Sequence, residues 1–182
     1  LNHPYRIFMH LPHYHHRPSQ MDALNVELWW KNNPILIDAG SYKYNESGIW
    51  QNAFSTEKFH NAPLINGRQP MIQKGSFLFL NRYDISWKPG AQSVFGKGIE
   101  AECNYQFQNG KKYYIKRQML PLPNNSWAII DFTEHPFMGT LTHYWNFANH
   151  ISSYLLWEHG SRMVKSIVHA SINQSRLYST WI

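Results

Sequence analysis

Leu24-Asn25-Val26-Glu27-Leu28-Trp29-Trp30-Lys31 carries the strongest periodicity in this sequence. Its apolar residues recur at every second position, so Leu24, Val26, Leu28 and Trp30 share one face of an extended chain. This alternation is typical of a β-strand with one buried face. Turn-forming residues at 31–34 and a second apolar run at 35–38 follow, and together they predict a β-hairpin.

Strand and turn signals continue along the rest of the chain. Asn66-Gly67 separates 62–65 from 71–72, and Asn109-Gly110 joins 99–107 to 112–119, both in the pattern of tight hairpins. The alternating runs 127–132 and 141–147 add two strands, whereas 46–59 predicts a short helix or an ordered loop. Many short strands separated by turns predict one all-β domain over residues 1–182, an antiparallel β-sandwich or a set of large layered antiparallel sheets.

The composition fits a packed domain with a basic surface. The 182 residues are 43% hydrophobic and 15% charged, which allows a core and excludes wholesale disorder. No apolar run approaches the ~18–20 residues of a membrane-spanning helix. The net charge of +6 favours anionic or sugar-like partners, and nucleic acid and acidic polysaccharide both qualify. Cys103 is the single cysteine, which excludes an intrachain disulfide and a Cys-based zinc site and leaves the compartment open.

Histidine is abundant, and four of the eleven histidines lie between positions 10 and 16. Residues two apart in a strand share a face, so His13 and His15 can offer two imidazoles to one metal ion. The alternative is a solvent-exposed loop bounded by proline, in which these histidines have no ligand.

Asp38 and His60 are two further candidates. Asp38 ends an apolar run, and a carboxylate at the buried end of a strand requires a partner or a cation. The alternative for Asp38 is a turn cap that accepts a backbone N–H from residue 40 or 41, and Asp131, which ends the similar run 129–130, is interpreted as such a cap. His60 precedes a strand and can join Asp38 in a divalent-metal site.

Three blocks of sequence resemble the heparinase II/III-like family in its C-terminal β domain. They lie within 17–69 and contain Arg17-Pro18-Ser19-Gln20-Met21-Asp22, Ile35-Leu36-Ile37-Asp38-Ala39-Gly40 and Phe59-His60-Asn61-Ala62. The resemblance implies a β-sandwich that pairs with an N-terminal α/α toroid, with β-elimination of acidic polysaccharides in the cleft between the two. Because the chain begins at Leu1 with no leader, we expect a piece of a longer protein that lacks its toroid.

The resemblance also implies a structural zinc. Asp38 falls on the aspartate of the family's strand-end motif, and His60 falls on the histidine of its His-Asn motif. In the family's His-x-His-x-Asp motif, which here ends at Asp22, the two histidine positions hold Pro18 and Gln20. The implied ligands are therefore Gln20, Asp38 and His60. Pro18 occupies the position of a catalytic histidine, so no catalytic residue is assigned and the chain alone is expected to be inactive.

Substrate contacts are expected near the same motif. Arg17 can face a sugar carboxylate, and Tyr42 and Tyr44, two residues apart, can present an aromatic face to the cleft. Ordinary sheet packing is the alternative for the tyrosines. The expected partners are an acidic polysaccharide and the toroid of the same chain, and this favours a periplasmic or secreted location.

Three other interpretations stay open. A non-catalytic carbohydrate-binding or scaffolding β domain in surface-polysaccharide metabolism would explain Pro18 and Gln20 as marks of lost activity. A metal-dependent hydrolase needs a third ligand among His13, His15 and His16. The basic aromatic stretch 111–117 fits nucleic acid, but no nucleic-acid-binding motif accompanies it, and the outward face of a β-hairpin explains it equally.

Overall fold

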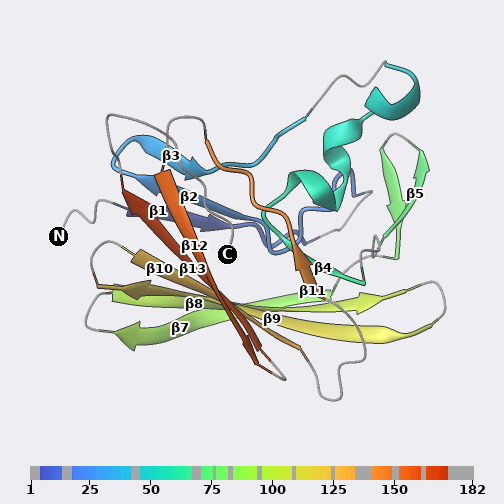
Figure 1. Ribbon diagram of the computed structural model, residues 1–182. Coiled ribbons are helices and arrows are strands. Elements are labelled where there is room, and N and C mark those ends of the chain that lie inside the picture. The colour runs from blue at the N-terminus through green and yellow to red at the C-terminus, as the bar shows by residue number, and fades with distance from the viewer. Residues whose placement is uncertain are drawn as a thin grey trace.

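The computed structural model describes residues 5–13, 18–41, 46–66, 71–75, 77–81, 84–93, 96–107, 110–123, 126–133, 141–148, 152–160 and 163–171, the last two through their backbone. Its regular elements are strands and three short 3₁₀ turns, and two β-sheets face each other as layers (Figure 1). The all-β antiparallel sandwich expected from the sequence is confirmed. In the portion of the chain that the structure describes, no helix has the length and apolar character to span a membrane.

The smaller layer is a three-stranded antiparallel sheet in the order β1-β2-β3. It contains β1 (Tyr5–Met9), β2 (Val26–Trp30) and β3 (Asn33–Leu36). The expected hairpin over 24–38 is thus present. Its turn places Lys31 in the left-handed region at φ 53°, which lets β3 fold back on β2.

The larger layer is a six-stranded sheet in the order β12-β13-β10-β9-β8-β7. Every neighbouring pair in it is antiparallel, and the expected hairpin around Asn109-Gly110 joins its two longest strands. Its strands are β7 (Asp84–Ser93), β8 (Gly96–Gln106), β9 (Lys112–Leu122), β10 (Ser126–Thr133), β12 (Ser152–Gly160) and β13 (Met163–Ser171).

Two short strand pairs and the 3₁₀ turns lie beyond one end of β3. β4 (Pro63–Ile65) pairs with β11 (Leu141–His143), and β5 (Ile72–Gly75) pairs with β6 (Leu78–Leu80). The turns η1 (Gly48–Trp50), η2 (Ala53–Ser55) and η3 (Glu57–Phe59) confirm an ordered loop at 46–59.

One expected hairpin is wrong. The segments on either side of Asn66-Gly67 do not pair with each other, because β4 takes the distant β11 as its partner instead. The expected strand over 141–147 is also shorter than its alternation indicates: β11 ends at His143, and Phe147 makes one isolated bridge to Leu36.

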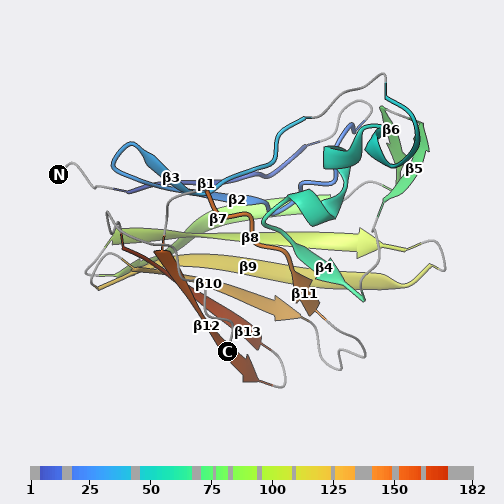
Figure 2. The same ribbon diagram turned by 45° about the horizontal axis from the view of Figure 1, so that its top comes forward.

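The core lies between the two layers, which Figure 2 shows stacked one above the other. Val26, Leu28 and Ile35 of the small sheet pack against Met119 and Ile129 of the large sheet. Val26 and Leu28 lie on the face that the alternating pattern of 24–31 assigns to the core, which explains why the small sheet meets the large sheet on this side. A second apolar cluster around Leu24 and Phe79 continues this core toward β5 and β6.

Candidate functional site

Asp38 begins the site at the point where the chain leaves the small sheet. Its Oδ1 accepts a hydrogen bond from the Gly40 backbone N–H at 2.6 Å. Gly40 has φ 69°, a conformation that glycine adopts without strain. The turn-cap interpretation of Asp38 is therefore confirmed.

The second oxygen of Asp38 holds two side chains from other parts of the chain. Asn25 donates to Oδ2 at 2.7 Å, and His60 Nδ1 lies 2.6 Å from the same atom. The His60 side chain is fully buried, and its position directly after η3 brings it to Asp38. The structure thus brings Asp38 and His60, two of the expected metal ligands, into direct contact.

Gln20 reaches the same turn. Its side-chain amide donates to the Gly40 carbonyl at 3.3 Å and to Ser41 Oγ at 3.1 Å. The three expected ligands, Gln20, Asp38 and His60, are thus linked through the residues of one turn. The expected substrate-binding residues Arg17, Tyr42 and Tyr44 lie outside the residues that the structure describes, as do His15 and His16.

The donor atoms at this turn are of types that can hold a cation: His60 Nδ1 lies 2.6 Å from Asp38 Oδ2, and Gln20 carries an amide oxygen. The buried His60 Nε2, to which the described residues give no hydrogen-bond partner, lies on the other side of the ring from Asp38. Within the described ranges, no three His, Cys, Asp or Glu side chains are placed so that they could hold one metal ion together. A cation here would therefore depend on one imidazole, one carboxylate and the amide oxygen of Gln20, which is a weaker zinc ligand than histidine.

A pocket of about 390 Å³ opens beside this turn. We name it the His10 pocket, and it is lined by Phe8, Met9, His10, Gln20, Asp22, Asn25, Glu27 and Asp38. It lies where β1 ends and β2 begins. The two expected metal ligands Gln20 and Asp38 thus form part of its wall.

His10 and Asp22 form an ion-pair contact in this pocket that the sequence did not predict. His10 Nδ1 lies 2.7 Å from Asp22 Oδ2, and the His10 side chain is 54% exposed while that of Asp22 is nearly buried. The hydrogen bond to Asp22 raises the pKa of His10 against the opposing effect of burial. Burial alone would raise the pKa of Asp22, but the bond and charge of His10 lower it. Only the folded chain brings these residues together: the His10 N–H donates to the Asn25 carbonyl and the Leu24 N–H donates to the His10 carbonyl, which closes the loop between them.

A second buried network lies deeper, between the layers. Arg117 is fully buried and binds Asp131 through two hydrogen bonds of 2.7 and 2.8 Å, and His143 Nε2 lies 2.7 Å from Asp131 Oδ2. Asp131 lies within β10, so the turn-cap interpretation of Asp131 is wrong. Burial opposes ionisation of Asp131, but the charge and hydrogen bonds of Arg117 lower its pKa well below the usual range.

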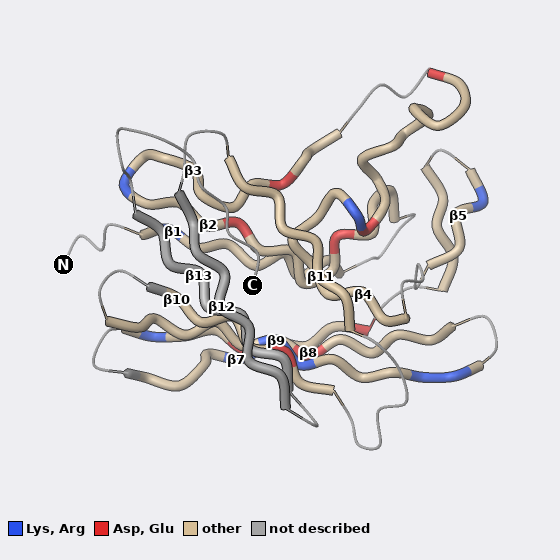
Figure 3. The backbone as a smooth tube through the Cα atoms, in the orientation of Figure 1, with Lys and Arg blue, Asp and Glu red and all other residues tan. Residues whose placement is uncertain are grey.

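Arg117 also changes the interpretation of the basic stretch 111–117. The neighbouring Lys116 contacts the Phe132 ring on the other face of the strand, whereas Arg117 points into the core. Figure 3 shows lysine, arginine and acidic residues distributed over both layers. The outward-facing hairpin is thus confirmed for Lys116, while Arg117 belongs to the interior of the protein.

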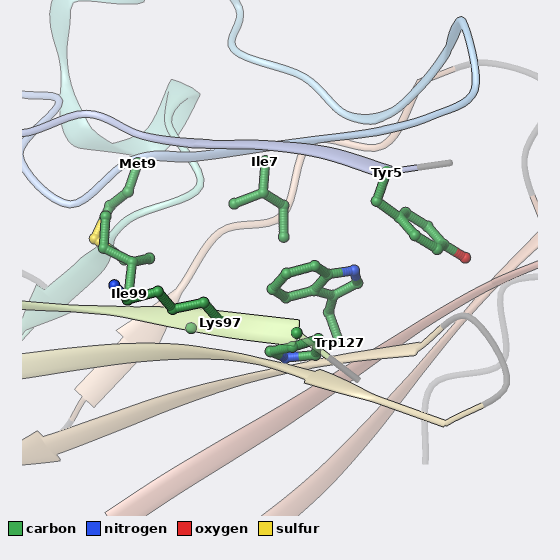
Figure 4. Close-up of a pocket in the computed structure, with 9 residues that line it drawn as sticks. Tyr5, Ile7, Met9, Lys97, Ile99 and Trp127 are labelled. Atoms are coloured by element: carbon green, nitrogen blue, oxygen red, sulfur yellow. The ribbon is translucent and has the colours of Figure 1, made fainter. Parts of the chain in front are cut away.

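A second pocket, of about 330 Å³, lies between the edge of β1 and the large sheet. Tyr5, Ile7 and Met9 point into it from β1, and Ile99 and Trp127 point toward them from the opposite layer (Figure 4). Burial raises the pKa of Tyr5 to about 12. The lining is largely apolar, so this pocket continues the inter-sheet core and is distinct from the polar His10 pocket.

Comparison with known proteins gives one match. Residues 8–167 match the family model described as heparinase II/III-like, C-terminal. Searches of the curated proteins and of the solved structures returned no significant match. The matched range includes most of both sheets, the Gly40 turn and the His10 pocket, and it associates the chain with polysaccharide lyases. The chain therefore belongs to the heparinase II/III-like C-terminal domain family.

Proposed function

We propose that this domain lines the substrate cleft of a polysaccharide lyase that cleaves an acidic polysaccharide by β-elimination. The proposal rests above all on the His10 pocket, a polar depression built from the segments that carry the family motifs. A toroid domain of the same protein would form the opposite wall of the cleft and supply catalytic side chains.

The chemistry of β-elimination explains why two domains would be needed. β-Elimination removes the proton at C5 of a uronic acid, forms a C4=C5 double bond and expels the oxygen at C4, which must be protonated. The negative charge that develops on the sugar carboxylate also needs stabilisation. Pro18 has no group that can transfer a proton, and Gln20 is held by Gly40 and Ser41. The His10 pocket therefore serves substrate binding, and the toroid would carry out the proton transfers.

The cleavage activity is tested on the protein that carries this domain together with its proposed toroid. We expect the protein to cleave acidic polysaccharides and to leave neutral polysaccharides intact. Cleavage is measured as an increase in the ultraviolet absorbance of the new double bond. Absence of this absorbance with glycosaminoglycans, alginate and pectate would contradict the proposed function.

We further propose that Asp38 and His60, with the amide oxygen of Gln20, hold a zinc ion that cross-links the Gly40 turn to the segment after η3. When bound, zinc would act as a structural ion at this position. We expect elemental mass spectrometry of the purified chain to find nearly one zinc per chain. An Asp38→Ala/His60→Ala double variant should lose it, and the exposed Asp84→Ala variant should retain it. Metal-free wild-type protein would remove the zinc proposal while leaving the polysaccharide proposal standing.

A non-catalytic binding or scaffolding domain is the second candidate. The observation in its favour is that Pro18 is buried and Gln20 is bonded to the turn, so neither offers a reactive group to a substrate. Binding of an acidic polysaccharide without cleavage by the toroid-containing protein would favour this second function.

A further inference from the structure

We propose that one end of this domain binds the surface of an anionic lipid bilayer. The binding surface consists of four exposed apolar side chains, Ile49, Trp50, Phe77 and Leu80, and we name it the apolar tip. None of the four lines the His10 pocket or belongs to the proposed zinc site. The inference therefore goes beyond the proposed function and does not depend on it.

The apolar tip gathers exposed side chains from two parts of the chain. Ile49 and Trp50 belong to η1, Leu80 belongs to β6, and Phe77 directly precedes β6. Figures 1 and 2 show η1 and the β5–β6 hairpin at the same end of the molecule, beyond the small sheet. Among the described residues, four of the six exposed large apolar side chains thus lie at this one end.

The exposure of these side chains is fixed by the fold, because buried neighbours anchor both elements. Phe79 of β6 is buried in the core, and its N–H donates to the Pro18 carbonyl. Ser55, which ends η2 just after η1, is buried, and its carbonyl accepts the Met21 N–H at 2.9 Å. The fold thus holds Ile49 in a position where its side chain is 84% exposed. Exposed apolar side chains gathered in one place mark a surface that meets a partner.

The types of side chain and their placement favour a bilayer as that partner. Ile49 and Leu80 have no hydrogen-bonding group and no flat ring for a sugar, but such side chains enter the acyl region of a membrane. Tryptophan is enriched where acyl chains meet lipid headgroups, and Trp50 stands beside Ile49. Figure 1 shows η1 on a narrow projection, which can enter a fluid bilayer without a matching cavity.

The charge of the surrounding sequence has the sign that an anionic bilayer attracts. Residues 41–81, counted with those that the structure does not describe, hold four lysine and arginine residues against two acidic ones. These residues are Lys43, Lys58, Arg68, Lys74, Glu46 and Glu57. Glu57 is buried, whereas Lys58 and Lys74 are exposed. Basic residues near a membrane surface add an attraction to anionic lipids that salt weakens, and the whole chain carries +6.

The test measures co-sedimentation with vesicles of phosphatidylcholine, with and without a quarter of phosphatidylglycerol. We expect the chain and the toroid-containing protein to bind the anionic vesicles about tenfold more tightly than the neutral ones, and added salt to weaken this binding. The double variant Ile49→Ser/Trp50→Ser should bind the anionic vesicles about tenfold more weakly. Trp87→Ser is the matched control, because Trp87 is 62% exposed but lies on β7 of the large sheet.

Brominated acyl chains, which quench tryptophan fluorescence on contact, locate the contact with lipid. They should quench part of the fluorescence of the bound wild type. Trp50→Phe should bind vesicles within about twofold of the wild type and lose this quenching, whereas Trp87→Phe should retain it. Thermal unfolding of every variant should match that of the wild type, because the substituted side chains are exposed.

Three results would overturn the inference. The first is equal vesicle binding by the wild type and by Ile49→Ser/Trp50→Ser. The second is vesicle binding by the chain but not by the toroid-containing protein, since the toroid would then cover the apolar tip. The third is a wild type that binds no vesicles while the double variant loses affinity for acidic polysaccharide, which would make the tip a sugar-binding surface. Cleavage of acidic polysaccharides tests the proposed function separately.

Discussion

Asn61 shows how much of this fold depends on one side chain. Its amide donates to the carbonyls of Val26 and Ile37, both at 2.9 Å, and its oxygen accepts the Asn146 N–H at 2.6 Å. These three bonds join β2, the segment after β3 and the segment after β11. Because Asn61 is fully buried, no water molecule can replace the bonds at their present positions.

We predict that Asn61→Ala lowers the free energy of unfolding by about 3 kcal/mol, since it leaves buried carbonyl and N–H groups without partners. Urea denaturation followed by tryptophan fluorescence measures the change. Asn32→Ala is the control: Asn32 is exposed and accepts a hydrogen bond from the exposed Arg6, so its loss should cost less than about 0.5 kcal/mol. Equal destabilisation by both variants would contradict a special role for Asn61.

For contacts of single side chains, the sequence predicted some and could not predict others. Asp38 followed by Gly40 is a local pattern, and the turn cap that the sequence offered as the alternative for Asp38 is present. Pairing of Asp38 with His60 followed from the family resemblance. Asn61 and the His10–Asp22 contact escaped prediction, because their partners are brought near only by the pairing of β1 with β2 and by the path of the loops.

At the start of β8, Gly98 lets the backbone of β8 lie very close to the backbone of β9. A Cβ atom on Gly98 would lie 2.5 Å from the Met119 carbonyl oxygen and 2.8 Å from Leu120 Cδ2. Backbone cannot yield as a flexible side chain does, so a methyl group here would push β8 away from β9.

We therefore predict that Gly98→Ala lowers the free energy of unfolding by about 2 kcal/mol or more. Thermal unfolding followed by circular dichroism should show a clear fall in the melting temperature. Gly75→Ala, in strand β5, is the matched control because nothing lies within 4 Å of its added Cβ. A melting temperature unchanged in Gly98→Ala would mean that the β8–β9 ladder relaxes freely around the methyl group.

β2, β3, β8, β9 and β10 were predictable as elements, whereas β1, β7, β12 and β13 were not predicted, and strand partners were predictable only when adjacent in the chain. Alternation and turn residues identified the hairpins β2–β3 and β8–β9, because a two-residue or short turn leaves little choice of partner. The same reasoning failed at Asn66-Gly67, where β4 pairs with β11. No local signal distinguishes a strand that pairs with its neighbour from one that pairs with a strand far along the chain.

The whole molecule is held together by polar contacts as well as by its apolar core. Arg117, on β9 of the large sheet, donates to the carbonyls of Leu24 and Asn61, both at 2.7 Å, while it also binds Asp131. It thereby joins the large sheet to the segments beside the small sheet. The sequence placed Arg117 in a basic outward-facing stretch, since charge patterns identify cations but do not reveal a buried carboxylate on the next strand.

Acid pH should weaken this connection between the layers. The pKa of Asp131 is lowered in the folded protein, because the charge and hydrogen bonds of Arg117 outweigh the effect of burial. A lowered pKa contributes stability above the ordinary aspartate pKa of ~3.9 and loses it as the pH falls toward the folded value. We predict that below pH ~4 this group reduces the free energy of unfolding by up to ~1.4 kcal/mol per pH unit.

Urea unfolding at a series of pH values tests this prediction with Asp131→Asn. The variant should be about 3–5 kcal/mol less stable than the wild type at neutral pH, because Arg117 keeps its buried charge without its partner. Its stability should then fall less steeply than that of the wild type below pH ~4, because the titrating carboxyl is gone. Asp84→Asn, at an exposed carboxyl, is the control, and its free energy of unfolding should change with pH as that of the wild type does. If the free energy of unfolding of Asp131→Asn falls with pH as steeply as that of the wild type, other carboxyl groups control acid unfolding. The Arg117–Asp131 pair would then join the layers without making their association sensitive to acid.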